Sequence, residues 1–246
     1  MDMFVSRLRD ACDGPVIVSH HSPDELGLLN CTGCEKCFRR GRCPLDRRDS
    51  FARVKEEILL ADLVILGSPV YAGMVSADMK LFIDRLAYWL HLMPLAGKYG
   101  VPIVTASTNH AIETVRYLET VMEWLGLCIP CTIPCTVDIP AMLSSERFVQ
   151  HSLAEYAKTV CDYYVTGRLA ASVAQERHFS GLARMYRRIP SEESVEAKFW
   201  RERGYLDYPS YQALQYGVSV RDSRAVDGRE GPRSSGPNGR RMGLSS

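Results

Sequence analysis

The sequence contains one closely spaced group of cysteines whose residue types and spacing suit metal chemistry. Cys31, Cys34, Cys37 and Cys43 lie within thirteen residues in the pattern C-x2-C-x2-C-x5-C, and Pro44 follows the last of them. Four thiolates on a short loop favour a [4Fe–4S] cluster, and a proline after the last cysteine is typical of ferredoxin-type sequences. Zinc prefers two cysteine pairs separated by a longer spacer, so it fits this spacing less well. A loop that holds no metal is the remaining alternative.

The residues around these cysteines favour the cluster. Gly41 permits the sharp return that brings the fourth cysteine back toward the other three. Positive charge nearby would offset the negative charge of a thiolate-bound cluster. Five arginines supply it: Arg39, Arg40, Arg42, Arg47 and Arg48.

Five further cysteines are spread along the chain. A stretch interrupted by prolines contains Cys128, Cys131 and Cys135. Free cysteines in such a stretch are commonly small buried apolar residues, and a second metal site is the weaker alternative. Cys12 and Cys161 fall on the apolar faces of expected helices. The total of nine cysteines is odd and unevenly distributed, which favours cytosolic thiols over the disulfide framework of a secreted protein.

The composition is that of a soluble globular protein. The 246 residues carry a net charge of +1, with 46% hydrophobic and 24% charged residues, so no strong field favours nucleic acid or an anionic membrane. Asp62, Lys80 and Asp84 interrupt the longest apolar stretches, and the first residues lack the apolar core of a secretory signal. We therefore expect a cytoplasmic protein with no membrane segment and no nucleic-acid partner.

Strand and helix patterns alternate along the first two thirds of the chain. Short apolar runs predict buried strands, and apolar residues at helical spacing predict amphipathic helices. The expected strands cover residues 15–20, 63–66 and 101–107, with an extended stretch at 128–137, and the expected helices cover residues 3–12, 51–61, 76–93, 111–126 and 144–167. This alternation predicts an α/β domain with a doubly wound parallel sheet over residues 1–167.

Two further regions are expected after this domain. Residues 168–215 predict a partly helical extension, in which Trp200, Tyr205 and Tyr211 lie close together and pack onto the main domain. Residues 216–246 are rich in glycine, serine, arginine and proline and contain few large apolar residues. Such a composition predicts a disordered tail.

A ligand site is expected at the carboxyl ends of the strands, because open α/β sheets bind their ligands there. The segments "GSPVYAGMVSA" and "ASTNHA" follow the strands at 63–66 and 101–107, and both open helices. Together with "K-x-F-x-D-R" at residues 80–85 and the four cysteines, "SPVY" and the following "SA" resemble the flavodoxin-like NAD(P)H-dependent FMN reductase family. The resemblance covers about residues 1–165 and is greatest to the iron–sulfur flavoprotein branch of the family.

The resemblance implies FMN at this edge of the sheet, reduced by NAD(P)H. Backbone groups after the first of the two strands would border the isoalloxazine ring, and the loop after the second would meet its pyrimidine side. The implied flavin-binding residues are Ser68, Pro69, Val70, Tyr71, Gly73, Ser107, Thr108, Asn109 and His110. His110 would donate a hydrogen bond to a flavin carbonyl, with capping of the next helix as the alternative. For Asp84 and Arg85, an ion pair that fixes the helix to the sheet is an alternative to catalysis, and no catalytic residue is assigned.

One departure from the family pattern concerns the first strand. Members of the family begin with a strand and a Gly/Ser-rich loop that cradles the FMN phosphate, whereas Met1 and Met3 already fall within the first expected helix. We therefore expect a flavodoxin-like sheet without that strand and without the phosphate loop.

The resemblance predicts an FMN-dependent NAD(P)H oxidoreductase that passes electrons between flavin and a [4Fe–4S] cluster to a small acceptor. The alternatives are an NAD(P)H:FMN or quinone reductase without a cluster, and a non-catalytic electron-transfer or accessory protein. A ferredoxin-like donor and assembly as a homodimer or homotetramer are the implied macromolecular partners.

Overall fold

The structure is a computed structural model that describes residues 1–136, 146–167 and 170–217. The tail expected to be disordered begins at residue 216, and nearly all of it lies outside the described residues. In the described part of the chain, no helix is long and apolar enough to cross a membrane.

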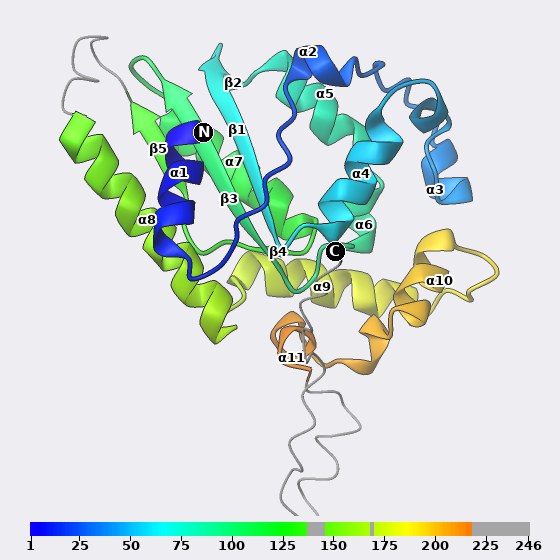
Figure 1. The fold of residues 1–246 in the computed structure, drawn as a ribbon. Helices are drawn as coiled ribbons and strands as arrows, with labels where there is room; N and C mark the ends of the chain where they lie inside the picture. The colour runs from blue at the N-terminus through cyan, green and yellow to red at the C-terminus, as the bar shows by residue number, and fades with distance from the viewer. Residues whose placement is uncertain (137–145, 168–169, 218–246) are drawn as a thin grey trace, which may run out of the picture.

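The centre of the fold is a mostly parallel sheet (Figure 1). Strands β1 (Leu63–Tyr71) and β3 (Lys98–Ala106) pair in parallel from Leu63 opposite Tyr99 to Pro69 opposite Thr105. The short strands β4 (Leu127–Cys128) and β5 (Ile133–Thr136) add to the other edge of β3, also in parallel. Strand β2 (Met74–Val75) turns back on the end of β1 as an antiparallel hairpin. This topology confirms the predicted α/β class.

Helices cover both faces of the sheet, and the side chains of β1 alternate between them. Val64 and Leu66 face one apolar core, while Leu63 and Ile65 pack against the other. The second face holds α1 (Asp2–Ala11) and α8 (Glu146–Thr166). The first face holds α4 (Phe51–Leu60), α5 (Ala77–Arg85), α6 (Trp89–Leu92) and α7 (Ala111–Trp124).

The strand predicted over residues 15–20 is absent from the structure, so that prediction is wrong. The segment crosses the molecule without ladder hydrogen bonds, and Ile17 is 94% exposed. The nearest strand edge is the outer edge of β1. Among the described strands, only β2 pairs with this edge, and it does so only near the end of β1. A cavity of about 2320 Å3, lined by both segments, lies between them. An extended segment becomes a strand only when a neighbouring edge satisfies its backbone groups, and here none is within reach.

The helix predicted over residues 76–93 is divided into α5 and α6 by a turn at residues 86–88. The predicted start is confirmed, because the Ser76 hydroxyl accepts a hydrogen bond from the Met79 amide at 3.2 Å. The turn buries Tyr88 and Trp89, which are 6% and 9% exposed, against the core. The local periodicity of the sequence continues through this turn, so the pattern alone did not indicate it.

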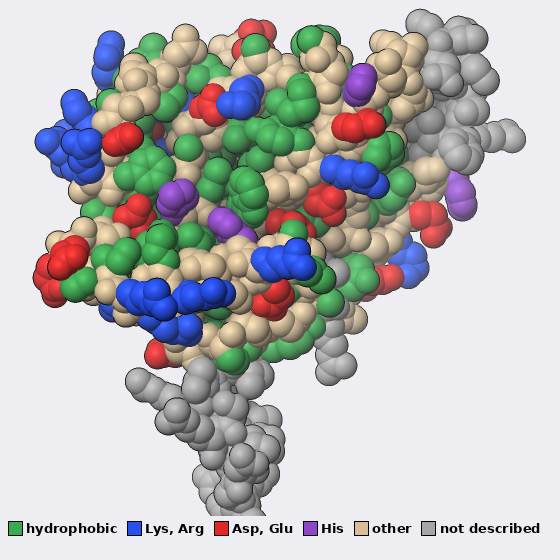
Figure 2. Space-filling view, turned by 180° about the vertical axis from the view of Figure 1, so that it is seen from behind, with side chains coloured by type: hydrophobic (Ala, Val, Ile, Leu, Met, Phe, Trp, Pro, Cys, Tyr) green, Lys and Arg blue, Asp and Glu red, His purple; other side chains and the backbone are tan. Residues whose placement is uncertain are grey.

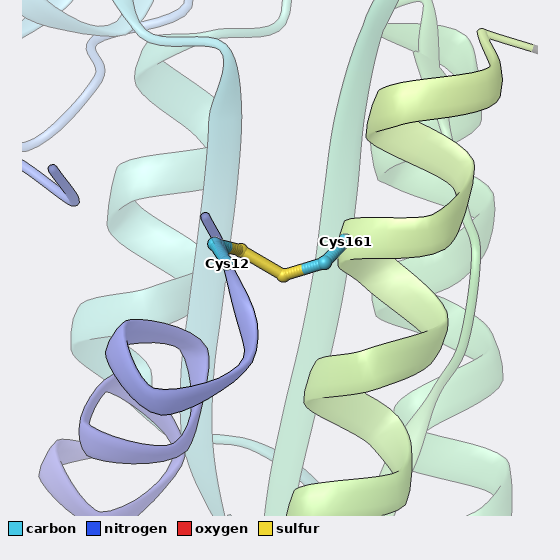
Figure 3. Close-up of a disulfide and its surroundings, with 2 residues drawn as sticks. All are labelled: Cys12 and Cys161. Atoms are coloured by element: carbon cyan, nitrogen blue, oxygen red, sulfur yellow. A yellow bond between two sulfur atoms is a disulfide. The ribbon is translucent and has the colours of Figure 1, made fainter. Parts of the chain in front are cut away.

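A disulfide joins the N-terminal helix to the last helix of the sheet domain (Figure 3). Cys12, just after α1, is bonded to Cys161 in α8 across a sequence separation of 149 residues. The expectation of free thiols at these two helix positions is therefore wrong. Both cysteines lie in the apolar core between α1 and α8, and the bond fixes α1 to that face of the sheet.

The C-terminal region adds a helical layer below the sheet as drawn in Figure 1, at the end where the parallel strands begin. It contains α9 (Val173–Tyr186), α10 (Val195–Glu202), the 3-10 turn η3 (Tyr205–Asp207) and α11 (Tyr211–Gln215). Its polar side chains satisfy carbonyls left free at the ends of α6 and α7. Trp200 Nε1 donates to His91 O at 2.9 Å, Gln175 Nε2 donates to Glu123 O at 3.2 Å, and the Tyr211 hydroxyl donates to Gly126 O, just after α7.

Candidate functional site

The two segments predicted to bind flavin come together at the carboxyl edge of the sheet. After β1 the chain turns sharply through Ala72 and Gly73, which have φ values of 50° and 79°. The His110 ring lies against this turn, because a Cβ placed on Gly73 would meet the ring at 3.6 Å. Thr114 Oγ1, in the first turn of α7, contacts Gly73 O at 3.5 Å. The loop after β1 and the loop after β3 therefore form one continuous surface.

Ser68 lies in the last part of β1, beyond the predicted strand of residues 63–66, and its side chain organises the first loop, which is the connection from β1 to α5. Ser68 is 4% exposed, its hydroxyl donates to Pro69 O at 2.9 Å, and it accepts a hydrogen bond from the Ser76 amide at 3.0 Å. These bonds fix the start of α5 against the end of β1. The hydroxyl of Ser68 is thus used within the loop, and a ligand at this edge would meet the backbone of Pro69 and Val70 and the exposed ring of Tyr71.

The second loop presents unpaired polar side chains. Ser107, Thr108, Asn109 and His110 are all exposed, and in the described part of the chain no hydrogen bond to the side chains of the first three is seen. His110 occupies the N-cap position of α7 with φ of 62°, and its side chain makes no capping hydrogen bond. The alternative role of His110 as a side-chain cap is therefore wrong, and the ring packs on Gly73 instead.

We call residues 30–45, which contain the four closely spaced cysteines, the cysteine loop. Left-handed residues Glu35 and Gly41 bound the short helix α3 (Lys36–Arg40), and the 3-10 turn η1 (Pro44–Arg47) follows. Cys31 and Cys34 are exposed, whereas Cys37 and Cys43 are half-buried. Within the described residues, no group of three or more Cys, His, Asp or Glu side chains is arranged as a metal site.

The thiols of the loop are nevertheless close enough to influence one another. Burial raises the pKa of Cys37, and the charges of Cys43 and Cys31 raise it further. In contrast, hydrogen bonds from the Lys36 amide and from the Thr32 hydroxyl lower the pKa of Cys34. The loop therefore combines one thiol, Cys34, whose lowered pKa favours the thiolate, with another, Cys37, whose thiolate is disfavoured by burial and by the neighbouring thiols.

Arg85 pairs with two aspartates that directly follow the cysteine loop, and not with the sheet. Asp84 forms an i,i+4 ion pair with Lys80 at 2.5 Å, while Arg85 contacts Asp46 at 2.8 Å and Asp49 at 2.5 Å. These partners lie 39 and 36 residues away in the sequence, so no local pattern indicated them. The ion pair expected as one alternative for Arg85 is therefore present, but it fixes the helix to the residues that follow the cysteine loop and not to the sheet.

The C-terminal region also contacts the cysteine loop. A Cβ placed on Gly41 would meet Val195 Cγ1 at 3.0 Å, so α10 packs directly on the turn between Cys37 and Cys43. Phe38 packs edge-on against Tyr88 and His91, with ring centroids 5.4 and 5.0 Å apart. The loop is thus supported on two sides by parts of the chain that sequence analysis did not connect with it.

A parallel sheet with polar loops at its carboxyl edge is the arrangement of a cofactor-binding α/β protein. Residues 4–133 match the family described as NADPH-dependent FMN reductase. The chain belongs to this family and is an NAD(P)H-dependent flavin oxidoreductase. The match confirms the resemblance predicted from the sequence.

Several relatives of known type share part of this chain. An iron-sulfur flavoprotein of Archaeoglobus fulgidus is 28% identical over 72% of this chain and 79% of its own length. An iron-sulfur flavoprotein of Methanocaldococcus jannaschii is 39% identical over 35% of this chain and 45% of its own. An FMN-dependent NADH:quinone oxidoreductase of Pseudomonas aeruginosa is 33% identical over 35% of this chain and 54% of its own. The alignment thus spans most of the first relative and about half of the other two.

The residues at the sheet edge fit the ring portion of FMN. An isoalloxazine ring needs a flat apolar neighbour and polar groups along its pyrimidine edge. The Tyr71 ring, 64% exposed, and the unpaired polar side chains of residues 107–109 are groups of these kinds. The first turn of α1 carries the acidic Asp2, whose charge disfavours a phosphate at that helix end.

Proposed function

We propose that this oxidoreductase transfers electrons from NAD(P)H, by way of FMN, to a [4Fe–4S] cluster held by Cys31, Cys34, Cys37 and Cys43, and from there to a small acceptor. The single observation that carries the proposal is the set of four closely spaced thiols on a loop that is anchored to α5 by Arg85. The similarity to an iron-sulfur flavoprotein over most of both chains supports it.

The flavin would supply the redox chemistry, accepting a hydride from reduced nicotinamide and releasing electrons singly. The chain itself would position the ring. The backbone of Ser68, Pro69 and Val70, the ring of Tyr71 and the close approach at Gly73 would border it on one side. The loop of Ser107, Thr108, Asn109 and His110 would donate hydrogen bonds to its pyrimidine edge.

Helix α5 connects the two proposed centres. Its N-terminus is tied to the flavin edge through Ser76 and Ser68, and its last residue, Arg85, is tied to the cysteine loop. Nine helical residues span about 13 Å. This single rigid element would therefore set the separation of the flavin edge and the cluster.

We also propose that the acceptor is a small molecule. The flavin ring would lie beside Tyr71 and Asn109, which are exposed, so its edge would be open to small molecules from solvent. A ferredoxin-like donor is the further partner that we propose. Lys and Arg side chains gather at the edge of the molecule that carries α3 (Figure 2), and an acidic redox protein would be attracted there. The exposed cations of this surface are Lys36, Arg39, Arg40, Arg42, Arg47 and Arg48.

Assembly as a homodimer or homotetramer is part of the proposal. Tyr71, Met74 and Ile112 are 64%, 42% and 48% exposed, and all three lie in the segments at the proposed flavin edge. Ile112 is at the start of α7, and its exposure leaves an apolar residue available beside the site. A second copy that covered these side chains would also enclose the ring.

The experiment is anaerobic purification followed by measurement of flavin, iron and acid-labile sulfide per chain. The proposal predicts about one flavin and about four iron atoms, with NAD(P)H bleaching the flavin absorbance. Flavin without iron would instead establish a reductase without a cluster. This second candidate is favoured by the absence of an assembled metal site among the described residues. A colourless protein without iron would leave the non-catalytic alternative.

A further inference from the structure

The two ends of the cysteine loop are joined by one side chain, Arg85. Its Nη1 donates to Leu29 O at 2.9 Å and to Asp49 Oδ2 at 2.5 Å, and its Nη2 donates to Asp46 Oδ1 at 2.8 Å. Leu29 precedes the loop, and both aspartates follow it. The guanidinium group therefore connects the residues on either side of a sixteen-residue segment that contains all four cysteines.

Asp49 closes the same junction from the opposite side. Its Oδ2 accepts a hydrogen bond from the Leu29 amide at 3.1 Å, and its Oδ1 accepts one from the Phe51 amide at 3.1 Å, at the start of α4. Both backbone groups of Leu29 are thus held by the Arg85–Asp49 pair. Asp46 is held in turn by Lys55 Nζ at 2.9 Å, which ties the loop to α4 as well.

The environment of Arg85 indicates a fixed structural role. Its side chain is fully buried, with the guanidinium carbon 5.0 Å from the centre of the Phe51 ring. A buried cation is costly unless its partners are placed accurately, and the planar fork of arginine achieves this where lysine does not. The hydrogen bonds of the Arg85 side chain go to Leu29, Asp46 and Asp49. Its Nε is buried without a hydrogen-bond partner among the described residues.

We propose that Arg85 is a positioning residue that closes the base of the cysteine loop and thereby keeps its four thiols on a short closed segment that can converge on one cluster. This inference rests on the proposed function, since it assigns the purpose of the closure to cluster binding. A segment whose two ends are already fixed has less conformational entropy left to lose when its thiols converge on a common ligand. Because α5 also begins at the proposed flavin site, the same residue fixes the loop relative to the sheet.

The first test measures the loop in iron-free protein by limited trypsin digestion. The cysteine loop offers four cleavage sites, at Lys36, Arg39, Arg40 and Arg42, and α9 offers others, at Arg177 and Arg184, as an internal reference. In Arg85→Met, cleavage in the loop is expected to rise ~10-fold relative to cleavage in α9, because local opening is enhanced without global unfolding. Arg85→Lys, which keeps the charge but not the fork, is expected to lie between this variant and the wild type.

The second test measures the cluster. After anaerobic reconstitution, Arg85→Met is expected to retain flavin but to bind less than half the iron of the wild type. The remaining cluster is expected to show a broadened electron paramagnetic resonance spectrum when reduced, and Arg85→Lys should partly restore both iron and spectrum. Arg187→Met is the matched control, because Arg187 Nη2 also bridges two carbonyls, Leu206 O at 3.1 Å and Tyr208 O at 3.3 Å, and neither is in the loop.

The outcomes separate this inference from the function on which it rests. If no version of the protein binds iron, the proposed cluster is wrong, and the digestion still decides whether Arg85 closes the loop. Equal acceleration of cleavage in the loop and in α9, or none in either, overturns the inference. Full iron binding in Arg85→Met with an unchanged spectrum also overturns it. If Arg85→Met does not retain flavin, Arg85→Lys takes its place in the test. It is then compared with Arg187→Met by the same measurements of loop cleavage, bound iron and electron paramagnetic resonance spectrum.

Discussion

The cysteine loop and the segment of residues 128–135 both carry closely spaced cysteines, but in different surroundings. Cys31 and Cys34 are exposed on a loop held by charged side chains. Cys128 is buried beside Tyr211, and burial raises its pKa to about 11. Burial likewise raises the pKa of Cys131 to about 12. Thiol chemistry depends on access and on the thiolate fraction, so the exposed Cys31 and Cys34 are better placed for the proposed metal binding than the buried Cys128.

Alanine substitutions should give the largest difference between the two segments. Cys34→Ala removes one of the four proposed thiolate ligands, so iron bound after anaerobic reconstitution is expected to fall from about four atoms per chain to a small fraction of that value. Cys131→Ala removes a half-buried thiol and should leave iron and flavin unchanged. Iron and sulfide analysis of the two variants measures the effect. Equal losses in both would show that the loop has no special role.

Alkylation rates in iron-free protein provide a second, smaller contrast. With a pKa of about 12, Cys131 is ionised to only ~10⁻⁴ at pH 8, whereas the lowered pKa of Cys34 keeps its thiolate present to lower pH than in an unfolded chain. Cys34 should therefore react with iodoacetamide at least ~100-fold faster than Cys131, as followed by mass spectrometry of tryptic peptides. Urea should abolish the difference. Similar rates in the folded protein would contradict the assigned environments.

Much of the fold follows from local sequence patterns. The apolar run from Leu63 to Leu66 indicated a strand buried on both faces, and the 3.6-residue periodicity of residues 111–126 indicated α7 with its stop at Gly126, which has φ of 97°. The strand expected at 15–20 failed because a strand depends on a neighbouring edge, which the segment itself cannot specify. Local pattern is therefore sufficient to locate most helices and the central strands, but not the turn at residues 86–88 or a segment whose structure depends on a distant partner.

The candidate site was only partly predictable for the same reason. The spacing of the four cysteines and the loops at the strand ends are visible in the sequence. The pairing of Arg85 with Asp46 and Asp49 and the Cys12–Cys161 disulfide link residues 36 to 149 positions apart. The contact between Val195 and Gly41 joins regions that sequence analysis assigned to separate units. Such long-range contacts depend on the packing of the whole chain, which one sequence without the structure does not reveal.

The dependence of stability on pH should distinguish the two segments by its sign. Near the cysteine loop, burial of Asp49 is outweighed by its hydrogen bonds from Arg85 and the Leu29 and Phe51 amides, so its pKa is lowered. An aspartate whose pKa is lower in the folded than in the unfolded protein stabilises the fold above the unfolded pKa of about 3.9. This contribution is lost as the pH falls through the folded pKa. Near Cys128, burial raises the pKa of Glu123, so its contribution is present at low pH and is lost as pH rises through the folded value.

Two neutral variants test these opposite signs through urea unfolding midpoints at pH 3 and pH 7. Asp49→Asn should lower the midpoint at pH 7 more than at pH 3, because at pH 3 the wild type has already begun to lose the contribution of the ionised carboxylate. Glu123→Gln should raise the midpoint at pH 7 relative to pH 3, because it removes the cost of ionising a buried carboxyl group. Asp13→Asn, at an exposed position, is the control and should shift neither midpoint. If both variants changed the unfolding midpoint in the same direction between pH 3 and pH 7, the two carboxyl groups would not lie in opposite electrostatic environments. The expected opposite signs arise because ion pairs and hydrogen bonds stabilise the charged form of Asp49, whereas burial destabilises the charged form of Glu123.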